Sequence, residues 1–185
     1  MDIAIVGATG NVGRKTLEVL EKKELPINNV YLVASSKSAG KKISFKGKNL
    51  EVFDLENFDF SKVKITFFAA GGKISEKFAE KAAQHCLVID NSSFYRMDPN
   101  VPLIVPQVNS NHLKNIKKNI ISNPNCSTAQ LVIALKPLHD LFVIKRVVVS
   151  TYQSVSGGGK APMDEMIEQT KLVLEGKNVK SKNFR

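Results

Sequence analysis

One cysteine stands where a short apolar stretch gives way to a helical pattern. The stretch Asn119 to Ser122 predicts a strand, and the sequence SNPNCST, Ser122 to Thr128, follows before an apolar-periodic run. Pro124 fixes its own φ and keeps Asn123 out of the α region, so the chain must turn before Cys126. The Asn, Ser and Thr residues of this segment are typical helix caps. The sequence therefore predicts Cys126 at the first turn of a helix.

A thiol in that position is suited to nucleophilic catalysis. The unpaired N–H groups and the positive end of the helix dipole stabilise the thiolate, and they could also hold a developing oxyanion. Free cysteines are more often small buried apolar residues. Cys86, in the apolar run Cys86 to Ile89, fits that description and Cys126 does not. We therefore predict Cys126 as a nucleophile and Cys86 as a core residue.

The first residues predict a strand, a glycine turn and a helix. Ile3 to Val6 is apolar, and the sequence GATGNVG, Gly7 to Gly13, follows it at once. The spacing GxxGxxG is a variant of the dinucleotide fingerprint GxGxxG, in which glycines let backbone N–H groups approach a pyrophosphate. A glycine-rich turn can also be only a tight connection between a strand and a helix. Its place directly after the first strand favours a nucleotide site.

The segment after the second predicted strand, Val30 to Ala34, indicates which nucleotide binds. Enzymes specific for NAD usually carry Asp or Glu there to hold the ribose 2′-hydroxyl. This chain has SSKSAGKK, Ser35 to Lys42, without an acid. Hydroxyls and a cation suit a 2′-phosphate, so we predict NADP. The two lysines that end the segment are explained as readily by a solvated loop. The predicted phosphate-side contacts are Ser35, Lys37 and Ser38.

Strand and helix patterns alternate along most of the chain, which is typical of a doubly wound α/β fold with a parallel sheet. The strand candidates are Ile3 to Val6, Val30 to Ala34, Ile43 to Phe45 with Leu50 to Phe53, Ile65 to Ala69, Leu87 to Asp90, Leu103 to Val105, Asn119 to Ser122 and Lys145 to Thr151. The helix candidates are Arg14 to Lys22, Ile74 to His85, Ser110 to Asn115, Ser127 to Leu141 and Pro162 to Leu174.

These patterns predict two domains. Residues 1–126 form a Rossmann-type NADP-binding domain, and residues 127–185 begin an α+β catalytic or dimerisation domain. One long strand and one helix cannot close a domain of their own, so we expect this second domain to be incomplete in the 185 residues.

Composition narrows the class of protein. With 43% hydrophobic and 24% charged residues, the chain is typical of soluble globular proteins. It has no run long enough to span a membrane and no cleavable leader before the first strand, and its two cysteines suggest no disulfide framework. We therefore expect a cytoplasmic protein. The net charge is +10, but the basic residues are dispersed along the chain and the sequence has no nucleic-acid-binding motif. We therefore expect phosphorylated small molecules rather than nucleic acid as ligands. We assign no metal site.

Six motifs in order carry a resemblance to a known family. They are GATGNVG at residues 7–13, ASSKSAGK at 34–41, DNSSFYR at 90–96, VPQVN at 105–109, SNPNCST at 122–128 and STYQSVSGGG at 150–159. Along all 185 residues the chain resembles the N-terminal portion of the bacterial aspartate-semialdehyde dehydrogenases. The resemblance implies NADP-dependent, phosphate-linked reduction of 4-phospho-L-aspartate to L-aspartate 4-semialdehyde through a cysteine thioester. That reaction serves lysine, threonine and methionine synthesis, and the full-length chain would form a homodimer or homotetramer.

The resemblance also implies residue roles. Cys126 would be the acyl-enzyme nucleophile, Gln153 would position the substrate, and Asn125 would support the same site. Arg96 would bind phosphate, and its position after a strand end and a hydroxyl-rich turn suits a planar fork for that anion. On sequence alone, a surface arginine and an exposed loop glutamine remain alternatives for Arg96 and Gln153. The expected cofactor contacts are Gly7, Thr9, Gly10, Asn11, Val12, Gly13, Ser35, Lys37, Ser38, Gly71, Ser156 and Gly157.

The chain departs from the family pattern in two ways. The family's acid/base histidine and the arginine for the substrate carboxylate belong to a later segment, beyond Arg185, and His85, His112 and His139 match no catalytic position. Lys37 stands where the family commonly has arginine, which keeps the charge and loses the fork. Because the acid/base histidine is not among these 185 residues, we expect the chain alone to be inactive. Three alternatives stay open: another acyl-phosphate or aldehyde dehydrogenase, a non-catalytic NADP-binding fragment of an interrupted gene, and a basic scaffold for polyanions.

Overall fold

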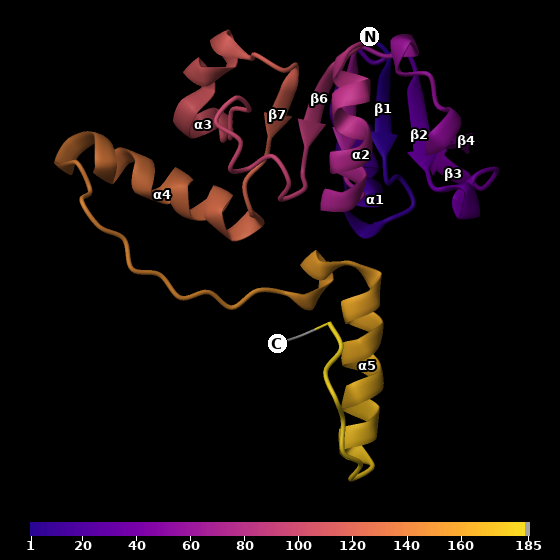
Figure 1. Ribbon diagram of the computed structural model, residues 1–185, viewed down its shortest axis with the longest axis vertical. Coiled ribbons are helices and arrows are strands. Elements are labelled where there is room, and N and C mark those ends of the chain that lie inside the picture. Colours follow the sequence, from indigo (N-terminus) through magenta and orange to yellow (C-terminus); the bar gives the residue numbers. More distant parts are fainter. Residues whose placement is uncertain (184–185) are drawn as a thin grey trace.

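A seven-stranded sheet is the core of the first 122 residues of the computed structural model, which describes residues 1–183 (Figure 1). The strand order is β3-β4-β2-β1-β5-β6-β7, and every neighbouring pair is parallel except the antiparallel β3–β4 hairpin. This order confirms the doubly wound α/β fold. The strands are β1 (Ile3–Val6), β2 (Val30–Ala34), β3 (Lys42–Phe45), β4 (Lys48–Asp54), β5 (Ile65–Phe68), β6 (Leu87–Asp90) and β7 (Ile120–Ser122).

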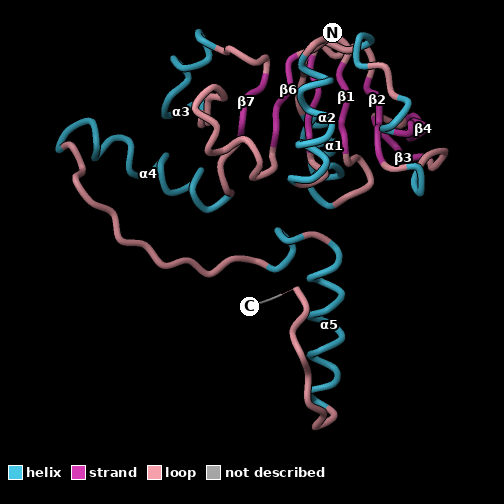
Figure 2. The backbone as a smooth tube through the Cα atoms, in the orientation of Figure 1, coloured by secondary structure: helices cyan, strands magenta, loops and turns pink. Residues whose placement is uncertain are grey.

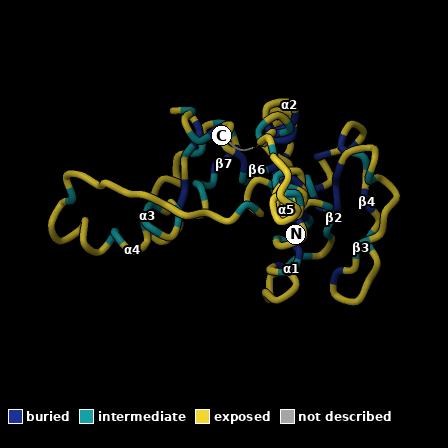
Figure 3. The backbone as a smooth tube through the Cα atoms, turned by 90° about the horizontal axis from the view of Figure 1, so that it is seen from below, coloured by how far each residue is buried: buried dark blue, intermediate teal, exposed yellow. Residues whose placement is uncertain are grey.

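Helices cover both faces of the sheet. Figure 3 shows α1 (Asn11–Lys22) and α2 (Gly72–Ala83) on opposite sides of the strands. Leu17 and Leu20 of α1 pack into one apolar cluster, and Phe78 of α2 packs into the other. Because strands covered on both faces can be apolar at every position, β1 reads IAIV with all four residues buried.

Of four further helices, two lie between β6 and β7 and two follow β7. They are α3 (Pro106–Asn109), the 3-10 helix η4 (Ser110–Asn115), α4 (Cys126–Phe142) and α5 (Lys160–Leu174). The predicted helices at Ser110 to Asn115, Ser127 to Leu141 and Pro162 to Leu174 are therefore present, the first as a 3-10 helix. No helix between residues 1 and 183 is long and apolar enough to cross a membrane.

The predicted strands at Leu103 to Val105 and Asn119 to Ser122 both differ in the structure. Leu103 to Val105 forms only one isolated bridge, from Leu103 to Ser122. Pro102 and Pro106 flank this segment and lack the N–H donors that would extend the ladder. Asn119 has a left-handed φ of 54°, so β7 begins one residue later than predicted.

The predicted strand Lys145 to Thr151 is wrong for the described residues. The chain leaves α4 through Val143, whose φ is 53°, and residues 143–154 run without secondary structure toward α5 (Figure 2). Val147, Val148 and Val149 are exposed. A strand needs a neighbour for its N–H and C=O groups, and no described strand pairs with this segment. The β-branched residues therefore favour an extended chain here, but the segment forms no strand because no described strand lies beside it.

Gly13 gives a direct test of how tightly α1 packs on the turn after β1. A Cβ at this position would lie 2.1 Å from the Gly7 carbonyl oxygen, which is a backbone atom that cannot rotate away. We expect Gly13→Ala to lower the free energy of unfolding by about 2–3 kcal/mol in urea titrations, because the overpacking outweighs the gain in helix propensity. Gly72→Ala is the matched control, since its nearest neighbour atom would be 3.9 Å away. Equal stability of the two variants would contradict this packing.

Candidate active site

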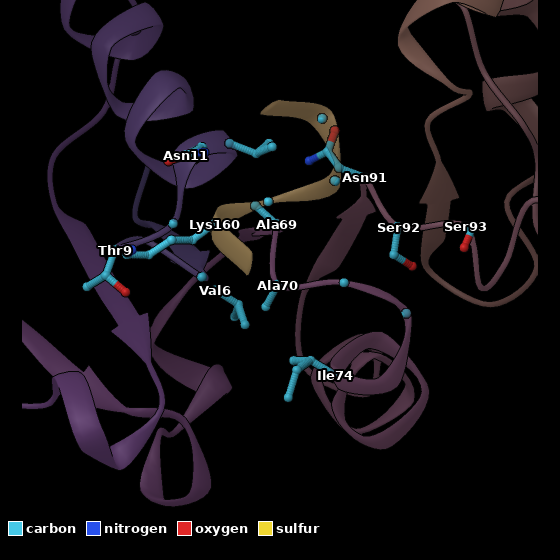
Figure 4. A pocket seen from close by; sticks show the side chains of 18 of the residues that line it. Val6, Thr9, Asn11, Ala69, Ala70, Ile74, Asn91, Ser92, Ser93 and Lys160 are labelled. Atoms are coloured by element: carbon cyan, nitrogen blue, oxygen red, sulfur yellow. The ribbon is translucent and has the colours of Figure 1, made fainter. Parts of the chain in front are cut away.

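A cavity of about 810 Å³ opens at the carboxyl edge of the sheet. Open α/β sheets bind their ligands at this edge, in the loops that follow the strands. The lining comes mainly from the turns after β1, β2, β5 and β6, from Asn125 before α4 and from the loop before α5. Figure 4 shows Thr9, Ala70 and Lys160 among the side chains around the cavity. Within the described residues the lining includes the cations Arg96 and Lys160 and no carboxylate. Such a cavity suits an anionic ligand.

The turn after β1 is built so closely that it requires glycine. Gly7 has a φ of 88°, and a Cβ there would lie 2.7 Å from the Ala69 carbonyl oxygen at the end of β5. The Gly10 N–H donates to the Gly7 carbonyl at 3.0 Å, which closes the turn. Helix α1 starts at the next residue, and its first-turn N–H groups have no acceptor within the helix. The lining residues Thr9 to Val12 therefore present a backbone cradle that fits the pyrophosphate of a dinucleotide.

Most of the predicted cofactor residues line this cavity. They are Gly7, Thr9, Gly10, Asn11, Val12, Ser35, Gly71, Ser156 and Gly157. Gly13 is buried against the turn and acts through packing. Lys37 and Ser38 belong to the 3-10 helix η1 (Ser36–Ser38) and do not line the cavity, and Lys37 is exposed. Of the three residues predicted to contact the 2′-phosphate, Ser35 therefore lines the cavity, whereas Lys37 and Ser38 lie outside it.

The three predicted catalytic residues come together at the start of α4. Cys126 is the first residue of this helix and is exposed, and Asn125 caps it by accepting the Ser127 N–H at 3.0 Å through Oδ1. The Gln153 side-chain amide donates toward Cys126 Sγ at 3.7 Å and Asn125 Oδ1 at 3.5 Å. Asn125 also lines the cavity. A glutamine 27 residues away in sequence thus reaches the thiol.

Arg96 is half-buried and held by two main-chain carbonyls. Its Nε donates to the Asn123 carbonyl at 2.9 Å, and its Nη2 donates to the Asn91 carbonyl at 3.2 Å. A guanidinium has five N–H donors, so the fork has further donors to offer an anion in the cavity that Arg96 lines. The structure therefore puts Arg96 beside the turn that leads to Cys126.

Sequence reasoning missed two features of this edge. Lys160 lines the cavity from the first turn of α5, where it forms an ion pair with Asp164. Its place directly after three glycines was the available signal. Asp90, at the end of β6, is fully buried and accepts three hydrogen bonds, from Ser75 Oγ at 2.7 Å, Ser92 N at 3.0 Å and Ser92 Oγ at 2.7 Å. Its signal was the motif DNSSFYR, in which a carboxylate ends an apolar strand.

The remaining candidates lie elsewhere. His85, His112 and His139 are exposed and none lines the cavity. Cys86 is 6% exposed and directly precedes β6. Burial raises the pKa of this thiol, with a smaller opposing effect from the Thr66 hydroxyl at 3.2 Å. Cys86 is therefore a core residue, as expected.

Comparison with known proteins agrees with this geometry. Residues 2–116 match the family model for the semialdehyde dehydrogenase NAD-binding domain, and residues 135–185 match the model for the semialdehyde dehydrogenase dimerisation domain. The chain belongs to the semialdehyde dehydrogenase family. The expected α/β cofactor domain followed by the start of a dimerisation domain is thus confirmed. Our boundary between residues 126 and 127 stays a prediction.

Similar proteins are aspartate-semialdehyde dehydrogenases. The Rickettsia bellii enzyme is 53% identical over 172 residues, which are 92% of this chain and 51% of that protein. The crystal structure of aspartate semialdehyde dehydrogenase II from Vibrio cholerae, complexed with ASA, has 46% identity and a TM-score of 0.92 over 99% of this chain and 55% of that one. The Candida albicans enzyme with NADP has 28% identity and a TM-score of 0.67 over 77% and 48%. The chain thus spans about half the length of the curated relatives it matches.

The two thiols should differ in reactivity toward iodoacetamide at neutral pH. Cys126 is exposed at a helix N-terminus, whereas Cys86 is buried and its pKa is raised by that burial. We expect Cys126 to be alkylated at least about tenfold faster, as followed by peptide mass spectrometry over time. Faster labelling of Cys86 would contradict the assignment of Cys126 as the nucleophile.

Proposed function

We propose that this chain carries the nucleophile, the phosphate-binding arginine and the cofactor cradle of an NADP-dependent aspartate-semialdehyde dehydrogenase. The observation that carries the proposal is the contact of Gln153 with Cys126 and Asn125, at the edge of a cavity that begins on the glycine turn. The names of the relatives support the substrate: 4-phospho-L-aspartate in the biosynthetic direction, with L-aspartate 4-semialdehyde and phosphate as products.

Cys126 begins the reaction. Its thiolate attacks the acyl carbon of the substrate, the bond from that carbon to the phosphate oxygen breaks, and a thioester forms on Sγ. The N–H groups at the start of α4 stabilise the oxyanion that develops during attack. Gln153, held beside Sγ, orients the substrate by a hydrogen bond from its amide. Arg96 stabilises the charge on the departing phosphate.

The cavity residues hold the cofactor beside this thioester. Thr9 to Val12 would bind the pyrophosphate, and Ser156 and Gly157 would lie toward the nicotinamide end. NADPH, when bound, supplies the hydride that reduces the thioester carbon. The carbonyl oxygen, left with the negative charge, then re-forms its C=O bond as the bond from that carbon to Sγ breaks, so Cys126 leaves as thiolate and the aldehyde is released. The absence of an acid after β2, in the segment that starts at Ser35, favours NADP over NAD.

The proton donor and the assembly complete the proposal. None of the three histidines lines the cavity, so we assign the acid/base group and the arginine for the substrate carboxylate to a segment outside residues 1–185. The match of residues 135–185 to a dimerisation domain supports a homodimer or homotetramer of the whole protein. An enzyme of amino-acid biosynthesis with a reactive thiol would act in the cytoplasm.

Cofactor preference tests the loop after β2. We expect NADP to bind more tightly than NAD in calorimetric titrations, because Lys37 and Ser38 follow the lining residue Ser35 and offer the charge and the hydroxyl that suit a 2′-phosphate. Lys37→Glu should weaken NADP binding on the order of tenfold and leave NAD binding nearly unchanged, since the reversed charge acts on the extra phosphate. Lys62→Glu, at the opposite edge of the sheet before β5, makes the same charge change as a control. Equal affinities of the unmodified chain for NADP and NAD would refute the NADP assignment.

Turnover tests the source of the proton donor. We expect residues 1–185 alone to show negligible phosphate-dependent reduction of NADP with aspartate semialdehyde, because loss of acid/base catalysis costs about 10² to 10⁴ in rate. Adding the remaining C-terminal part of a relative, fused or separate, should restore the rate. Cys126→Ser should abolish the restored activity. Robust turnover by the chain alone would mean that a residue such as His112 or His139 serves as the base.

A further inference from the structure

Two asparagines join the ends of three neighbouring strands. Asn91 follows β6, and both its main-chain N–H and its Nδ2 donate to the Phe68 carbonyl at the end of β5, at 2.9 and 3.2 Å. Its Oδ1 accepts from Asn123 Nδ2 at 2.6 Å. Asn123 follows β7, and its main-chain N–H donates to the Asp90 carbonyl at 2.8 Å. We call this pair, Asn91 and Asn123, the asparagine clasp.

The surroundings fix the orientation of the Asn91 amide. A carbonyl such as that of Phe68 only accepts hydrogen bonds, so Nδ2 must face it and Oδ1 must face Asn123. The Asn123 amide then has to present Nδ2. One hydrogen-bond pattern therefore satisfies both side chains, and losing either side chain breaks the bond between the two loops.

The guanidinium of Arg96 rests on the main-chain carbonyls of these same two residues. Nε donates to Asn123 and Nη2 donates to Asn91, so a change in the separation of the two loops disturbs at least one of these bonds. Pro124, with its restricted φ, links Asn123 to the Asn125 cap of the helix that begins at Cys126. The clasp residues therefore hold the Arg96 guanidinium through their carbonyls and, through Asn123 and Pro124, connect to the start of the helix that carries the thiol.

We propose that Asn91 and Asn123 are positioning residues that set the place of the Arg96 guanidinium relative to the Cys126 thiol. The role deepens the proposed function and rests on it, because an arginine that stabilises a departing phosphate must lie beside the acyl carbon that the thiol attacks. The clasp acts through Arg96 and needs no contact with substrate.

Alkylation of Cys126 by two reagents reports this geometry without turnover. Iodoacetate is an anion and iodoacetamide is neutral, and both react with the same thiolate. Exposure and ionisation of the thiol change both rate constants by the same factor, so they do not change the ratio of the two. Nearby cations attract only the anionic reagent, so the ratio reports the electrostatic potential at the thiol. A unit charge about 6 Å away changes that ratio on the order of threefold even at the dielectric constant of water, and more in a partly buried site. The measurement uses the whole 185-residue chain at low ionic strength, with peptide mapping to separate Cys126 from Cys86.

The clasp predicts which variants change the ratio. Arg96→Met should lower the ratio of iodoacetate to iodoacetamide rates about threefold or more. Asn91→Ala and Asn123→Ala should each lower it toward the Arg96→Met value, and the double variant should add little because both single changes remove the same bond. Asn57→Ala, at an exposed asparagine of the 3-10 helix after β4, should keep the parental ratio. Where an alanine variant does not give a folded chain, the serine variant, too short to span the clasp, replaces it with the same expectation.

Three outcomes would overturn the proposal. In the first, Arg96→Met lowers the ratio and both asparagine variants keep it, so the clasp does not place the cation. In the second, Arg96→Met keeps the ratio, so the arginine does not face the thiol. A change in both alkylation rates at a constant ratio would mean loosened loops only and also counts against the clasp. Failure of the proposed function would show instead as no dehydrogenase activity after complementation, with the alkylation ratio still dependent on Asn91 and Asn123.

Discussion

The parallel register of the sheet places the site loops that follow β1, β5, β6 and β7 at one edge. Val6 pairs with Phe68, Phe68 with Asp90, and Asp90 with Ser122, so four strands end in a single row. The next residues of these strands are therefore also neighbours. Gly7 lies against Ala69, and Asn91 bonds to Asn123. A slip of one residue in any strand would turn its side chains to the other face and break this row.

This row explains why residues of very different kinds are needed at adjacent positions. On the β1 side, the main chain of Gly7 comes so near the β5 end that a Cβ would collide with a carbonyl. On the β7 side, the main chains are joined by the hydrogen bond from Asn123 N–H to the Asp90 carbonyl, and the side chains of Asn91 and Asn123 add a second bond between the two loops. The buried Asp90 carboxylate accepts hydrogen bonds from Ser75 and Ser92. Its hydrogen bonds face the protein, which leaves Arg96 and Lys160 to set the charge of the cavity.

The sequence is most predictive where local chemistry determines structure. The glycine turn from Gly7 to Gly13 and the helix start at Cys126 depend on residues within a few positions of each other, so both could be predicted. The placement of Asn91 beside Asn123 depends on strand register, which no local pattern shows. The opposite failure occurs at Lys145 to Thr151, where β-branched residues predict a strand that has no described partner. Lys37 does not line the cavity, so its contact with a 2′-phosphate stays a prediction from its residue type.

The candidate site combines a rigid part with a weakly packed part. Cys126, Arg96 and the glycine turn follow strands of a sheet whose central residues are buried on both faces. Gln153 and Lys160 come from the segment after α4, where Glu165 is the one buried residue among those of α4 and α5. Gln153 nonetheless reaches Cys126. The sheet alone therefore fixes the positions of the Cys126 thiol, of Arg96 and of the glycine turn. The position of the Gln153 amide depends instead on how the segment after α4 is held against the sheet.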